Sequence, residues 1–157
     1  MSKNVIVFYS KDNNTRTAAK LVSERIEAQI VELIETKKGN FIQALRKKGS
    51  KLQGNPWDEI KDADSIFLMF PIWASNGVPA MNAFLDHADF NEKKVSIITL
   101  QQFEDLRNSG KVHDYVQKRV EDKGGKVVYK KALLGGKMNH YAGEPALKVE
   151  VDKLKFN

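Results

Sequence analysis

V-I-V-F-Y-S-K-D-N-N-T, residues 5–15, places an apolar run, a polar loop and the start of a helical pattern in immediate succession. The run predicts a buried strand over Lys3–Tyr9, and the spacing of apolar residues after the loop predicts a helix over Thr15–Ala28. Such a loop offers backbone N–H groups at a helix N-terminus, where the helix dipole favours an anion. The pattern therefore predicts a phosphate-binding loop with the candidate ligands Ser10, Asn13, Asn14 and Thr15.

Asp12 places a carboxylate in the same loop. At about 4 Å from a phosphate, that charge would cost on the order of 4 kcal/mol at an effective dielectric constant near 20. The loop N–H groups, the helix dipole and Arg16 would offset part of the cost, and Asp12 turning outward or capping its own loop is the alternative. Taken alone, the loop is equally consistent with an ordinary helix cap.

The remaining chain alternates apolar runs with helical patterns. A helix is expected to begin at Pro79, a second one carries apolar residues over 112–120, and a turn or two is expected near Phe41–Leu45. Further strands are expected at Ile30–Ile34, Ser65–Phe70, Val95–Leu100 and Lys126–Leu134. This alternation predicts an α/β fold: a doubly wound, five-stranded parallel sheet with helices on both faces and a ligand crevice at the carboxyl ends of the strands.

The 157 residues fit a single domain, without an internal repeat. The tail Gly135–Asn157 is less regular, and it either adds an edge strand at Val149–Val151 or wraps the surface. Trp57, which follows Asn55-Pro56, is expected to be a packing residue at the sheet edge.

Composition excludes several classes of function. The absence of cysteine excludes thiolate metal sites, cysteine nucleophiles and redox disulfides, so redox chemistry would need a bound cofactor. No apolar stretch approaches the roughly 20 residues of a membrane span, and we expect a cytoplasmic protein. No serine-histidine-aspartate set or P-loop is readable. The histidines show no metal-ligand spacing, and the surface is their expected location: His87, His113 and His140.

The net charge is +6, from 26 basic and 20 acidic residues. Part of the excess lies in Lys37–Lys51, which contains no acidic residue. The segment is either a solvated connector or a docking patch for an anionic partner. No aromatic residues are interleaved as base stacking would require, so a nucleic-acid role is the weaker interpretation.

Two loops give the chain a resemblance to the flavodoxin family, over residues 3 to about 134. The family's first loop has the form S/T-x-T-G-x-T, which Ser10, Asn14 and Thr15 match while Asp12 and Asn13 replace threonine and glycine. Asn13 tolerates the left-handed backbone for which the family uses glycine. The second loop commonly reads P-x-W-W-G, and most of it is matched by Phe70, Pro71, Ile72, Trp73 and Ala74.

The resemblance implies the strand order 2-1-3-4-5 and a flavin mononucleotide (FMN) cofactor. It places the flavin phosphate at Ser10–Thr15 and the ring beside Trp73. The third loop departs from the family because it lacks glycine, and its candidate ring contacts are Leu100, Gln101, Gln102 and Phe103.

The implied function is electron transfer by a non-covalently bound flavin, with an acidic redox partner suited to the basic surface. Two alternatives stay open. One is an FMN-dependent reductase of the NAD(P)H:quinone type, which needs an open ring face. The other is a binding or regulatory module of the same fold that has lost flavin, which Asp12 and the altered third loop favour.

Overall fold

A computed structural model describes residues 3–73, 76–102, 107–135 and 139–156. The strands are β1 (Asn4–Phe8), β2 (Gln29–Glu32), β3 (Glu35–Lys37), β4 (Lys51–Leu52), β5 (Ser65–Pro71), β6 (Lys94–Gln101) and β7 (Lys126–Leu134). The helices are α1 (Asn14–Ile26), α2 (Phe41–Leu45), the 3-10 helix η1 (Pro56–Ile60), α3 (Pro79–His87), α4 (Arg107–Glu121) and α5 (Glu144–Val151). The predicted strands and helices up to β7 are thereby confirmed, with ends shifted by a few residues.

The main sheet has five parallel strands in the order β2-β1-β5-β6-β7. The order of neighbouring strands agrees with the predicted 2-1-3-4-5. The numbers differ because β3 and β4 are two additional strands outside the main sheet. β3 and β4 pair with each other as a separate antiparallel sheet, which the sequence analysis did not predict. The short strands lie at the two ends of the segment expected to be a connector, where alternation of apolar and polar residues is too brief to indicate a strand.

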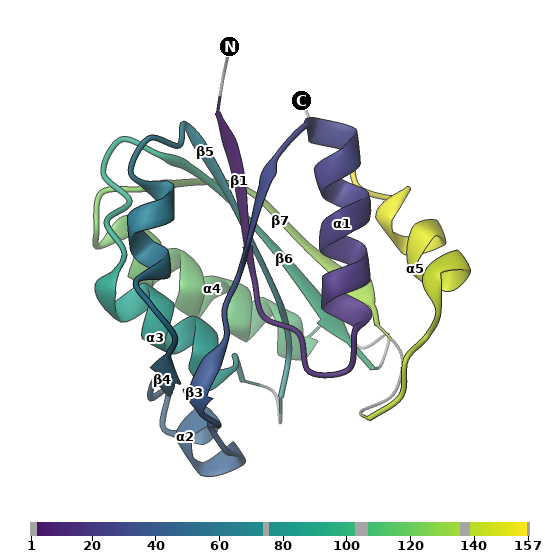
Figure 1. Ribbon diagram of the computed structural model, residues 1–157, viewed down its shortest axis with the longest axis horizontal. Coiled ribbons are helices and arrows are strands. Elements are labelled where there is room, and N and C mark those ends of the chain that lie inside the picture. Colours follow the sequence, from purple (N-terminus) through teal and green to yellow (C-terminus); the bar gives the residue numbers. More distant parts are fainter. Residues whose placement is uncertain (1–2, 74–75, 103–106, 136–138, 157) are drawn as a thin grey trace.

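Helices cover both faces of the sheet (Figure 1). Because side chains alternate along a strand, Val5 and Val7 join the core under α3 and α4, whereas Ile6 and Phe8 join the core under α1 and α5. The strands run in one direction, so all their carboxyl ends meet at one edge of the sheet. The loops after β1, β5 and β6 leave from that edge.

The tail contradicts the edge-strand alternative, because Val149–Val151 is the last turn of α5. Pro145 in the first turn and Glu144 beside the helix N-terminus favour a helix start there. Leu147 and Val151, four residues apart, are buried against the α1 face of the sheet. Glu150 accepts a hydrogen bond from the Leu134 N–H at 2.9 Å, which ties α5 to the end of β7.

Trp57 is a packing residue, as predicted. It lies in η1, packs against the buried core and stacks on His87, with ring centroids 4.3 Å apart. It is remote from the loops at the carboxyl edge and plays no part in the site.

Candidate functional site

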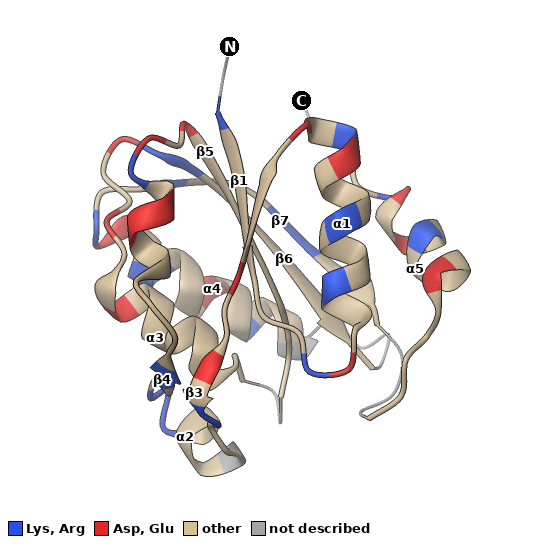
Figure 2. Ribbon diagram, in the orientation of Figure 1, with Lys and Arg blue, Asp and Glu red and all other residues tan. Residues whose placement is uncertain are grey.

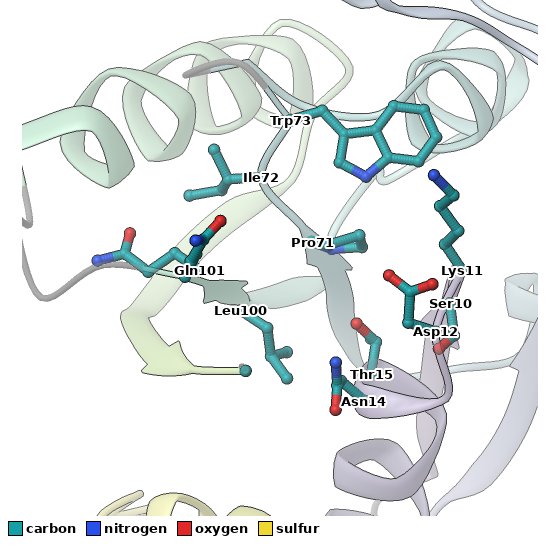
Figure 3. Close-up of a pocket in the computed structure, with 12 residues that line it drawn as sticks. Ser10, Lys11, Asp12, Asn14, Thr15, Pro71, Ile72, Trp73, Leu100 and Gln101 are labelled. Carbon is teal, nitrogen blue, oxygen red and sulfur yellow. The ribbon is translucent and has the colours of Figure 1, made fainter. Parts of the chain in front are cut away.

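The loops after β1, β5 and β6 enclose a cavity of about 60 Å³ at the carboxyl edge of the sheet (Figure 3). The structure places most of the predicted site residues around it: Ser10, Asp12, Asn14, Thr15, Pro71, Ile72, Trp73, Leu100, Gln101 and Gln102. Lys11 and Gly135 also line the cavity, and the sequence analysis did not single them out. Asn13 does not line it, and Ala74 and Phe103 lie outside the described residues.

The N-terminus of α1 forms one wall of the cavity. Asn13, the residue before the helix, has a φ of 68°, the left-handed conformation expected for it. Its side chain makes no capping hydrogen bond, and the first turn contains no acidic residue. The hydroxyl oxygen of Ser10 is buried and has no hydrogen-bond partner among the described residues. An uncapped helix N-terminus beside a buried hydroxyl suits a phosphate group, which accepts hydrogen bonds from both.

The Asp12 carboxylate lies in the cavity wall and points into the site (Figure 3). Its Oδ2 accepts a hydrogen bond from the backbone N–H of Asn139 at 2.9 Å, so it neither turns outward nor caps its own loop. Arg16 does not balance this charge directly. Its Nε donates to Glu32 on β2 at 2.6 Å, and its guanidinium also donates to the Asn13 side chain.

Residues 139–142, here called the 139–142 segment, pack over the first turn of α1. The amide of Asn14 holds this segment at two points: Nδ2 donates to the His140 carbonyl at 2.9 Å, and Oδ1 accepts from the Ala142 N–H at 2.8 Å. Both polar atoms of Asn14 are therefore used within the chain. The sequence analysis missed this contact, and the only local signal was Gly143-Glu144-Pro145, which marks the start of α5 directly after the segment.

Trp73 forms the upper wall in Figure 3 and is only 8% exposed. Its indole meets the Tyr9 ring edge to face at 5.9 Å, and the Lys11 ammonium lies 5.5 Å from its centroid. Backbone hydrogen bonds join Trp73 to Asn76 in both directions. Burial, and then the neighbouring Glu35 carboxylate, raises the pKa of Tyr9 far above its ordinary value, so its hydroxyl stays protonated. The indole is held in place by neighbours on several sides.

The third loop brings three strand ends together. The Leu100 carbonyl accepts from the Ile72 N–H at 3.0 Å, and the Gln101 carbonyl accepts from the Gly135 N–H at 2.9 Å. Gln101 is buried, whereas Gln102 is exposed. A Cβ at Gly135 would lie 2.8 Å from the Leu100 Cβ, so this close approach requires glycine.

His113 contradicts the surface location expected for the histidines, although His87 and His140 are exposed. On α4 it is 8% exposed, and its Nε2 lies 2.7 Å from the Thr99 hydroxyl in β6, behind the third loop. Burial, with a contribution from Lys130, lowers the pKa of His113 to about 4, so the ring is neutral near pH 7. Its spacing from Val116 and Val120 places it on the apolar stripe of the helix, a signal the sequence analysis did not use.

The described residues contain no group of three or more histidine, aspartate or glutamate side chains placed to hold a metal ion. They also contain no helix that is long and apolar enough to cross a membrane.

Comparison with known proteins matches no family model and no curated sequence. Solved structures are similar over nearly the whole chain. A Bacteroides uniformis protein with a provisional assignment as a flavoprotein has a TM-score of 0.70 and 21% identity, covering 97% of this chain and 99% of that one. Oxidised flavodoxin 2 from Bacillus cereus has a TM-score of 0.59 and 16% identity, covering 96% and 94%.

A flavoprotein from Lactobacillus acidophilus, solved in complex with FMN, has a TM-score of 0.64 and 14% identity, covering 84% of this chain and 93% of that one. At identities this low, the comparison shows a similar backbone fold and does not show that the residues of a site are shared. Together with the order of the five parallel strands, these structures show that this chain has the flavodoxin-like fold.

Proposed function

We propose that this chain binds FMN non-covalently at the carboxyl edge of its sheet and acts in electron transfer. The observation that carries the proposal is the buried, unpartnered hydroxyl of Ser10 beside the uncapped N-terminus of α1. The Ser10 hydroxyl and the backbone N–H groups at the start of the helix can donate hydrogen bonds, which a phosphate accepts. The fold neighbours support the choice of cofactor, because one of them was solved with FMN bound.

The residues around the cavity fall into two groups, one suited to the phosphate and one suited to the flavin ring. Ser10, Thr15 and the first turn of α1 would hold the phosphate, for which the cavity of about 60 Å³ has room for a few water-sized groups. Trp73 and the amides of Gln101 and Gln102 flank the mouth, where an aromatic ring system would find apolar surface and hydrogen-bond partners. FMN itself supplies the redox chemistry, at its ring.

Asp12 is the feature that sets the affinity. Its carboxylate is directed into the site and would repel the phosphate, so the wild-type chain should bind FMN more weakly than a chain without that charge. Asp12→Asn removes the charge and keeps an oxygen that accepts from Asn139. We expect this variant to bind FMN at least about tenfold more tightly, since a tenfold change corresponds to only about 1.4 kcal/mol.

The test is a titration of FMN into each protein, followed by quenching of flavin fluorescence. Ser10→Ala should weaken binding, and Asp62→Asn is the matched charge control because Asp62 is exposed and distant from the site. The proposal fails if the wild type and Asp12→Asn both leave flavin fluorescence unquenched.

The second candidate is a binding or regulatory module that has lost flavin. It is favoured by the Asp12 carboxylate in the site and by the use of both Asn14 amide atoms to hold the 139–142 segment. In that case neither Asp12→Asn nor Asp12→Thr restores any affinity for FMN, because the site has been converted to an internal contact.

For the electron-transfer role, we propose an acidic partner protein. Lys37–Lys51 contains Lys37, Lys38, Arg46, Lys47, Lys48 and Lys51, and Figure 2 shows basic residues gathered on β4 and the segment leading to it. This region lies beside the start of α3, because the Ser50 N–H donates a hydrogen bond to the Pro79 carbonyl, and α3 follows the loop that carries Trp73. Partner association that did not weaken as salt is raised would contradict this docking role.

A further inference from the structure

A second cavity in the described part of the chain lies at the opposite edge of the sheet from the site. It has a volume of about 550 Å³ and is lined by the amino ends of β1, β5, β6 and β7. Asn4, Ser65, Lys94 and Lys126 are the first residues of those four strands, and all four line it. Lys155 and Phe156 form the wall on the α1 and α5 side. We call this cavity the amino-edge groove.

The groove exists because α5 is too short to cover its face of the sheet. Its eight residues extend for about 12 Å, whereas the nine residues of β7 extend for about 30 Å. In Figure 1 the helix lies beside the lower half of α1, and the chain then runs back towards the N-terminal edge of the sheet. Of the described residues after α5, Lys155 and Phe156 reach the amino ends of the strands.

The floor of the groove is apolar and aromatic. Phe67 is 7% exposed, and its ring meets Phe156 edge to face at 5.4 Å. Tyr129 meets Phe156 on another side at 5.7 Å. Val128, also in the lining, is 50% exposed, an unusual state for a valine in a strand. This surface would accept the apolar body of a ligand.

The rim of the groove is cationic. Lys94, Lys126 and Lys155 line it, and no acidic residue does so among those the structure describes. All three lysines are exposed, and within the described ranges none of them forms an ion pair, although Lys61, Lys118, Lys130, Lys148 and Lys153 all do. Three unpaired cations around a recessed apolar floor would attract an anion that also has apolar surface.

From this combination we infer that the amino-edge groove is a binding site for a small organic anion with an apolar or aromatic body, such as an aryl-substituted carboxylate. A volume of about 550 Å³ lies within the range of small-molecule sites, which are concave and mostly apolar with a few polar groups. The site is separate from the proposed FMN site, so neither depends on the other.

The experiment is a titration of uniformly ¹⁵N-labelled protein with 4-phenylbutyrate, monitored by amide chemical shifts. The neutral 4-phenylbutanamide is the matched ligand, since it keeps the aromatic body and loses the charge. We expect the carboxylate to shift the amides of Ser96, Val128 and Phe156, and to leave those of Thr15 and Gln101 in place. The amide ligand should bind more weakly at the same residues.

Lysine variants then test which positive charges contribute to binding. Lys94→Gln and Lys126→Gln should each weaken 4-phenylbutyrate about threefold to fivefold, as expected for one exposed charge, and the double variant should weaken it further. Lys20→Gln is the control, because Lys20 is exposed on α1 and does not line the groove. Both strand lysines are exposed, so the variants should keep the dispersed spectrum of the folded chain.

Several outcomes would overturn the inference. They are equal binding of the amide, binding unchanged by the lysine variants, shifts that occur at Thr15 and Gln101 instead, or no shift at millimolar 4-phenylbutyrate. Groove signals that move with protein concentration alone would show that a second copy of the chain covers this face, which also contradicts a small-molecule site.

Discussion

The carboxyl and amino edges of the main sheet differ in how closely the surrounding segments pack. At the carboxyl edge, three loops enclose a cavity of about 60 Å³, and the side chains of Asp12 and Asn14 are hydrogen-bonded to the 139–142 segment. At the amino edge, a cavity of about 550 Å³ stays open, and its lysines have no acidic partner among the described residues. The difference follows from the position and length of α5, which Glu150 ties to the end of β7 and which is only eight residues long.

The comparison separates an edge organised by hydrogen bonds from an edge whose main feature is the charge of its rim. The carboxyl edge is preorganised by hydrogen bonds, so substitutions there should change stability and local order. The amino edge has an open groove because α5 is short, so substitutions on its rim should change ligand affinity and leave stability almost unaffected. The following predictions test that contrast.

Acid should destabilise the carboxyl end through His113. Its pKa is lowered from 6.5 to about 4 by burial, with a contribution from Lys130. Between these values the unfolded chain binds more protons than the folded one, so the free energy of unfolding falls as the pH falls from 6.5 to 4. The expected loss is about 3 kcal/mol, measured by urea unfolding across this range. His113→Gln keeps a partner for Thr99 and should remove this part of the slope; an unchanged slope would contradict the assignment.

Asn14→Ala should release the 139–142 segment. It removes two hydrogen bonds and leaves the Ala142 N–H unpaired, so the free energy of unfolding should fall by about 2 kcal/mol. Hydrogen exchange at the Ala142 amide should accelerate while that of the β5 amides does not. Asn13→Gly is the matched control, because glycine adopts the φ of 68° without strain. Unaltered exchange at Ala142 would mean that the segment is held by other contacts.

Phe156→Ala should cost less, because the amino edge is only loosely closed. Its ring has edge-to-face contacts with Phe67 and Tyr129, but the residue is half-buried. We expect a loss of about 1 kcal/mol in urea unfolding, since aromatic pairs contribute about that much. Phe156→Leu, which keeps much of the apolar volume, should lose less. A loss of the size seen for fully buried phenylalanines would show that this end is packed as tightly as the other.

Glu32→Gln should have the smallest effect, although it breaks the ion pair with Arg16. The two side chains are 28% and 34% exposed, so the pair is screened and should contribute no more than about 0.5 kcal/mol. Unfolding at low and high salt measures this contribution. The change also removes the negative charge that neutralises Arg16 near the proposed phosphate site, so FMN affinity should rise slightly if that site is used; a fall in affinity would contradict this placement of Arg16.

The sequence predicted the framework well because its signals are local. Long apolar strands such as Ser65–Pro71, and helix starts such as Pro79, are decided by residues close together in the chain. It failed where the deciding partner is distant. The side chain of Asn14 is bonded 126 and 128 residues away, to His140 and Ala142, and no local pattern indicates such a contact.

The location of His113 and the structure of the tail were also missed because they depend on distant segments of the chain. The stripe formed by Val112, Val116 and Val120 predicted a helix, but the burial of His113 follows from the packing of α4 on β6, where the ring meets the Thr99 hydroxyl. V-E-V at 149–151 alternates as a strand does, yet Leu147 and Val151 share a helical face that the sheet buries.

By itself, the sequence determined the alternation of strands and helices, the polar loop at the head of α1 and the left-handed Asn13, because periodicity, capping and backbone preference act over a few residues. The tertiary structure alone decided that Asp12 faces into the site, that the 139–142 segment occupies Asn14, and that a short α5 leaves three lysines around an open groove. These features arise from the packing of distant segments against one sheet, where the length of one element determines what another must cover.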